Sequence, residues 1–68
     1  MNKEHIVCGS IELLKSAKQA SSEIGNRAGK DIGYLRGLEA AEDRTMPKDW
    51  AFLMSSDNKI MEIMRLVV

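Results

Sequence analysis

The sequence has too few cysteines to be held together by disulfide bonds. Cys8 is the only one, so no disulfide can form within the chain. Metal ligands are scarce as well, because the nearby pair His5 and Cys8 supplies fewer ligands than a structural zinc site requires. A chain this short rarely gains more than about 3–5 kcal/mol from one core. We therefore expect the protein to gain stability as a homo-oligomer, without a metal or another cofactor.

The chain also lacks an excess of charge of either sign. Ten Lys and Arg residues balance ten Asp and Glu residues, with no block of one sign. Proteins that bind DNA without sequence specificity need a basic excess to release counterions, so binding to nucleic acid is not expected. No apolar run approaches the roughly 18–20 residues of a membrane span. A single free thiol is typical of a reducing compartment, which favours the cytoplasm.

Proline is nearly absent, and its one occurrence divides the chain. Pro47 follows a polar stretch, and residues of about 43–47 are expected to connect two elements. Before them, apolar residues recur at steps of three and four from Leu13 to Leu38, without the alternation of a strand. This periodicity predicts a long helix over residues of about 3–43.

A second helix is predicted over residues of about 47–67, because Thr45 can cap it and Pro47 fits its first turn. One face of this helix would be more apolar than a single neighbouring helix can cover. We therefore expect an all-α fold, a helical hairpin in one domain over residues 1–68, that buries this face against another chain. The predicted interface residues are Trp50, Leu53, Ile60, Met61, Met64 and Val67.

Four glycines at intervals of four residues form a ladder, namely Gly25, Gly29, Gly33 and Gly37. Each would cost a helix interior about 0.8–1 kcal/mol relative to alanine, so a continuous helix would need a compensating contact. Such a ladder lets a neighbouring backbone or a flat ligand approach closely. The alternative is that residues 25–29 form a loop and the chain folds as three short helices.

Cations beside the ladder indicate where an anionic ligand could bind. Arg27, Lys30 and Arg36 flank the bare backbone, and Tyr34 could stack against a nucleobase. The alternative is that these cations are solvated and pair with neighbouring carboxylates. The segment 25–31 is not a phosphate-binding P-loop, which needs a longer spacing between its glycines and a serine or threonine after its lysine.

Catalytic groups are as scarce as metal ligands. The one histidine, His5, lies near a terminus, and Cys8 has no acid or amide partner at a suggestive spacing. We therefore expect a protein that is not an enzyme. A helix-turn-helix regulator is also disfavoured, because the last segment offers only Lys59 and Arg65 as cations.

The end of the chain resembles a known family. Residues 60–67, Ile-Met-Glu-Ile-Met-Arg-Leu-Val, are similar to the end of the second helix in small phage proteins known as sponges. The resemblance implies a helical hairpin that assembles into oligomers and sequesters cyclic nucleotide signals of bacterial immunity. It would carry over Arg65 as a ligand contact. The sequence departs from the family at Leu53 or Met54, where an arginine is expected, and in having the glycine ladder.

Two functions are therefore predicted. The first is a phage-type inhibitor that sequesters a cyclic nucleotide. The alternative is an inhibitor or adaptor that inserts a Met-rich helix face into the groove of a protein partner. The residues predicted to bind the nucleotide are Arg27, Lys30, Tyr34, Arg36 and Arg65.

Overall fold

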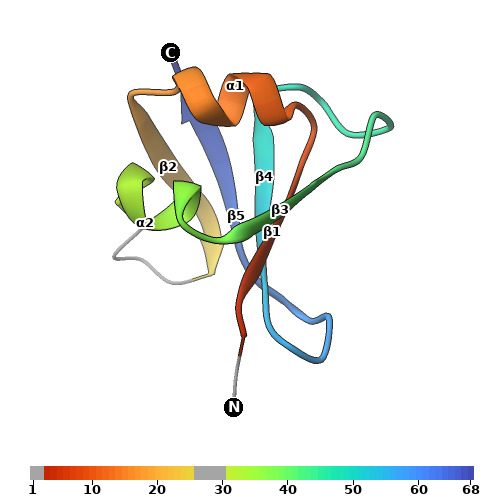
Figure 1. The fold of residues 1–68 in the computed structure, drawn as a ribbon. Helices are drawn as coiled ribbons and strands as arrows, with labels where there is room; N and C mark the ends of the chain where they lie inside the picture. Colours follow the sequence, from red (N-terminus) through yellow and green to blue (C-terminus); the bar gives the residue numbers. More distant parts are fainter. Residues whose placement is uncertain (1–2, 26–30) are drawn as a thin grey trace.

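The computed structural model describes residues 3–25 and 31–68, with residues 24 and 25 described by their backbone alone. Its five strands form one mixed sheet in the order β2-β5-β4-β1-β3, accompanied by two short helices (Figure 1). β1 pairs in parallel with β3, and the other neighbouring strands pair antiparallel. In chain order the elements are β1 His5–Cys8, α1 Ile11–Ser16, β2 Gln19–Gly25, α2 Ile32–Arg36, β3 Glu39–Glu42, β4 Trp50–Met54 and β5 Ile60–Val67.

The prediction of an all-α helical hairpin is wrong. The region predicted as one helix over residues 3–43 contains β1, α1, β2, α2 and β3, and the region predicted as a helix over residues 47–67 is the antiparallel pair β4 and β5. Residues 43–47 do lie between two elements, but these are the strands β3 and β4.

The strand β5 was mistaken for a helix because both of its faces are largely apolar. Its residues alternate in burial, with Met64 and Leu66 buried while Arg65 and Val67 remain exposed. This is the two-residue period of a strand, which the apolar residues on the second face conceal in the sequence. The turn between β4 and β5 indicates a strand pair more clearly than the strands do. Its Asn58 has a φ of 63°, a turn conformation that asparagine tolerates better than most residues.

Both helices cover the same face of the sheet. Leu14 and Ala17, in and just after α1, and Leu35 of α2 are buried together with alternate residues of the central strands. α1 crosses the end of the sheet near the C-terminus of the chain (Figure 1). The strand residues in this core are Ile6, Cys8, Ala51, Leu53, Met64 and Leu66.

The glycine ladder does not exist as a helical ridge. Gly25 ends β2, Gly33 lies in α2 and Gly37 caps that helix, while Gly29 lies outside the described residues. Both the continuous helix and the three short helices are therefore wrong. Of Gly9, Gly33 and Gly37, Gly9 has the tightest surroundings, since an added Cβ atom would lie 1.9 Å from the carbonyl oxygen of Pro47.

Replacing Gly9 with alanine should lower the free energy of unfolding by about 3 kcal/mol, because backbone atoms would have to separate. The amide of Gly9 donates to the Trp50 carbonyl at 3.0 Å, so this separation would also disturb the start of β4. Gly37→Ala is the matched control, since its Cβ atom would meet nothing closer than 3.4 Å. Urea denaturation measures both, and equal stability of the two variants would contradict the close approach.

A buried carboxyl group lies on the face of the sheet that carries the core. Glu62 of β5 has an exposed fraction of 0 %, and neither of its carboxyl oxygens has a hydrogen-bond partner among the described residues. Its cross-strand neighbours are Leu53 of β4 and Gly25 of β2. Burying a carboxyl group without a partner costs free energy, so this residue weakens the fold.

Replacing Glu62 with leucine should raise the free energy of unfolding by about 1–3 kcal/mol, because an apolar side chain needs no partner there. Glu62→Gln removes the charge but keeps polar atoms, so its gain should be smaller. Glu12→Leu on the exposed surface of α1 is the control, with an expected change within about 0.5 kcal/mol. A loss of stability in Glu62→Leu, measured by denaturant titration, would mean that the carboxyl group is satisfied.

Candidate functional site

One face of the sheet carries neither helix. Side chains alternate along each strand, so the residues between the buried ones point to this second face. We call it the open face. Its members include His5 and Val7 of β1, Gln19 and Ser21 of β2, Glu39 and Ala41 of β3, Trp50, Phe52 and Met54 of β4, and Ile63, Arg65 and Val67 of β5.

An apolar row crosses the middle of the open face. Val7 lies opposite Phe52, and Phe52 lies opposite Ile63. All three are partly exposed, although they occupy the three neighbouring central strands of the sheet. Val67, on the same face, is 37 % exposed. A contiguous apolar patch of this kind marks an interaction surface more often than a free surface.

Charged groups of opposite sign lie toward opposite corners of the open face, Arg65 on β5 beside the edge strand β2 and Glu39 on the edge strand β3. The guanidinium of Arg65 lies 5.4 Å from the ring centroid of Trp50, and its Nε atom is 3.7 Å from a carboxylate oxygen of Asp49. At the other corner, Glu39 on the edge strand β3 pairs in register with His5. Three strand spacings and four residue steps separate the two corners, which gives a diagonal of about 20 Å.

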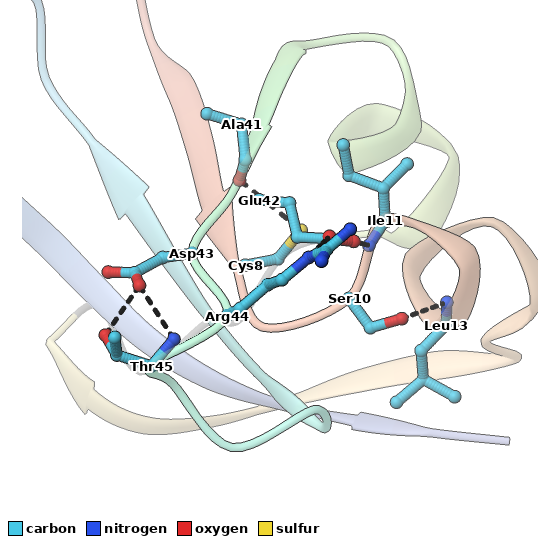
Figure 2. A network of polar contacts seen from close by, with 9 residues as sticks. All are labelled: Cys8, Ser10, Ile11, Leu13, Ala41, Glu42, Asp43, Arg44 and Thr45. Atoms are coloured by element: carbon cyan, nitrogen blue, oxygen red, sulfur yellow. Dashed lines mark hydrogen bonds and ion pairs between the residues drawn. The ribbon is translucent and has the colours of Figure 1, made fainter.

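A polar network ties β3 to the start of α1, as Figure 2 shows. The Glu42 carboxylate accepts a hydrogen bond from the amide of Ile11 at 3.0 Å, and its other oxygen lies 3.2 Å from the Nε atom of Arg44. The hydroxyl of Ser10 accepts from the amide of Leu13 and caps the helix. These bonds satisfy backbone donors at the helix start, so the network is structural.

The same network shifts the pKa values of its acids. The amide of Ile11 lowers the pKa of Glu42, and Arg44 adds to this effect. Hydrogen bonds from the hydroxyl and the amide of Thr45 lower the pKa of Asp43. Burial raises the pKa of the Cys8 thiol, which donates to the carbonyl of Ala41. A thiol with a raised pKa is a poor nucleophile.

Acid should destabilise the fold partly through Glu42. Because its folded-state pKa lies below its ordinary value of 4.5, its stabilising contribution is present above that pH and is lost as the pH falls through the folded-state pKa. Glu42→Gln should therefore flatten the fall of stability between about pH 5 and about pH 3. Arg44→Gln keeps the bond from Ile11 and should flatten it less. Identical pH profiles of the wild type and Glu42→Gln in thermal melts would contradict this.

A pocket with a volume of about 530 Å³ lies at the start of β1 and β3. The hydroxyl of Tyr34 donates to the carboxylate of Glu4 there, which raises the pKa of Tyr34. Charges of both signs line the pocket, so it offers no single ligand chemistry. The pocket is lined by Lys3, Glu4, His5, Tyr34, Gly37, Leu38 and Glu39.

No three metal-binding side chains lie close enough to hold an ion in residues 3–25 and 31–68.

The predicted nucleotide-binding residues are not brought together. Tyr34 lines the pocket, and Arg65 lies on the open face. Arg36 instead donates to the carbonyl oxygens of Leu14 and Ala17, where it joins α2 to the end of α1. Arg27 and Lys30 lie outside the described residues.

The predicted interface is divided between the two faces of the sheet. Leu53 and Met64 are fully buried in the core, so the folded chain cannot offer them to a partner. Trp50 and Val67 lie on the open face. Ile60 and Met61, at the start of β5, are 52 % and 41 % exposed. A strand sends alternate residues to opposite sides, whereas the predicted helix would have gathered all of them on one stripe.

Sequence reasoning missed the residues at the centre of the open face. The predicted interface contains none of Val7, Phe52 and Ile63. The signal that could have found them is the density of aromatic and β-branched residues in β4 and β5, which favours strands.

Comparisons with protein-family models, curated proteins and solved structures gave no significant match. The helical hairpin implied by the resemblance to phage sponges is not formed, since residues 60–67 make up the strand β5. Among the described helices, neither is long and apolar enough to cross a membrane. The open face is the candidate site because of its geometry alone.

Proposed function

We propose that this chain is a non-enzymatic binding protein that works as a homodimer, and that the open face is the dimer interface. The observation that carries the proposal is the uncovered apolar row of Val7, Phe52 and Ile63 on the central strands. Covering these side chains removes apolar surface from water, which drives association. The proposal places the protein in the cytoplasm, in keeping with its free thiol, Cys8.

A second copy is the partner that suits this face. Two-fold dimers use the same patch on both copies, so the patch must be complementary to itself. The open face has an apolar centre, with Arg65 at one corner and Glu39 at the opposite one. Two such faces can bring apolar side chains together and opposite charges together. Aligned or crossed packing of two sheets at a separation of about 10 Å is a common arrangement.

The size of the face sets the expected affinity. Five strands about 4.8 Å apart, with about five residues each, give a footprint of about 24 by 17 Å. Stable interfaces usually bury about 800 Å² on each partner, so this one lies at the small end. We therefore expect a dissociation constant in the micromolar range, about 1–100 µM.

Sedimentation equilibrium at about 200 µM should show a dimer of the wild type. Phe52→Glu places a carboxylate at the centre of the open face and should give a monomer with an unchanged far-ultraviolet circular dichroism spectrum. Val67→Glu, at a more exposed position, is a second variant in case Phe52→Glu does not fold. Lys15→Glu, exposed on α1, is the control and should remain a dimer. A folded wild-type monomer at this concentration would overturn the proposal.

A second experiment, calorimetry, separates this function from sequestration of a nucleotide. Arg65 stacked over Trp50 could hold a base, and such a ligand would compete with the second copy for the open face. Calorimetry with cyclic dinucleotides and trinucleotides on the wild type should give no heat of binding under the homodimer proposal. Binding that Arg65→Ala abolishes would replace the homodimer function by nucleotide sequestration.

A further inference from the structure

We infer that the two copies cross at nearly a right angle, with Arg65 of each copy paired to Glu39 of the other. This inference rests on the proposed homodimer and adds the two residues that fix its orientation. It starts from the charges at the corners of the open face. Glu39 is exposed, and its carboxylate has no ion pair or side-chain hydrogen bond within the described residues.

Arg65 can accept a second carboxylate. Its side chain is 49 % exposed, and its contact with Asp49 is a long one at 3.7 Å. The ring of Trp50 supports the guanidinium from one side. A guanidinium has five N–H donors, so donors remain for a carboxylate that approaches from a facing sheet.

Only some two-fold axes bring these groups together. An axis parallel to the strands and centred on β4 would place β5 over β1 of the other copy and β3 over β2, which separates the two charges. An axis perpendicular to the strands would place each strand over the equivalent strand of the other copy, which also separates the two charges. An axis along one diagonal of the open face would place Arg65 near Arg65 and Glu39 near Glu39, which is repulsive.

The other diagonal axis exchanges the two corners. With strands about 4.8 Å apart and residues rising about 3.3 Å each, this axis places Arg65 within about 4 Å, in projection, of Glu39 of the other copy. Phe52 then lies on the axis against its own equivalent, and Trp50 lies over the other copy's Val7. The strands of the two copies cross at about 90°, the orthogonal class of sheet packing.

Charge reversal tests this pairing. Arg65→Glu and Glu39→Arg should each weaken the homodimer about tenfold, because each places like charges together twice. An equimolar mixture of the two variants should recover the wild-type affinity, because both facing pairs are then of opposite sign. The affinity of the mixture should fall as salt is added. Sedimentation velocity with one variant fluorescently labelled measures the mixed dimer directly.

The outcomes separate the inference from the proposed function. Two variants that each dimerise like the wild type would overturn the pairing and leave the homodimer intact. Weak variants whose mixture does not recover would also overturn it, because the loss would then come from the contacts of Arg65 within its own copy, with Trp50 and Asp49. A monomeric wild type would remove the homodimer itself. Recovery in the mixture supports both.

Discussion

The amount of helix in this chain limits what its sheet can bury. α1 has six residues and α2 has five, so each is less than about 10 Å long. The sheet has five strands and spans about 24 Å across them. Two such helices can shield one face of it at most, and they pack on the same one. The bare second face, and with it the candidate site, follows from this shortage of cover.

The prediction of a helix over residues 47–67 is wrong because this stretch is apolar on both sides of the strand pair β4 and β5. In β4, Ala51 and Leu53 enter the core while Trp50, Phe52 and Met54 face outward. With no polar side, alternation cannot be read, and the apolar positions also satisfy the looser helical spacing. The regular spacing of the glycines also favoured a helix in the sequence. In the structure, however, Gly25, Gly33 and Gly37 belong to a strand end, a short helix and the cap of that helix.

Some physical constraints were nevertheless readable without coordinates. The residues of about 47–67 carry more apolar surface than one neighbouring helix could cover, and β4 and β5 leave Phe52 and Ile63 partly exposed. The residues of the site were harder to find, because a helix and a strand group the same sequence differently. Trp50 and Arg65 meet only because β4 and β5 are paired in register. No spacing along the chain predicts such a contact.

The direction in which the side chains of β5 point explains both the buried carboxyl group of Glu62 and the apolar residues on the open face. Each side of the strand carries one charged residue, Glu62 on one and Arg65 on the other. A shift of one residue would expose Glu62 but bury Arg65, because register and facing are coupled in a strand. On the open face the side chain of Arg65 lies against Trp50 while its guanidinium stays in contact with water. Turning it into the core would remove this hydration. Keeping Arg65 outward therefore leaves Glu62 buried, without a hydrogen-bond partner among the described residues. It also turns Ile63 and Val67 outward, where a second copy can cover them.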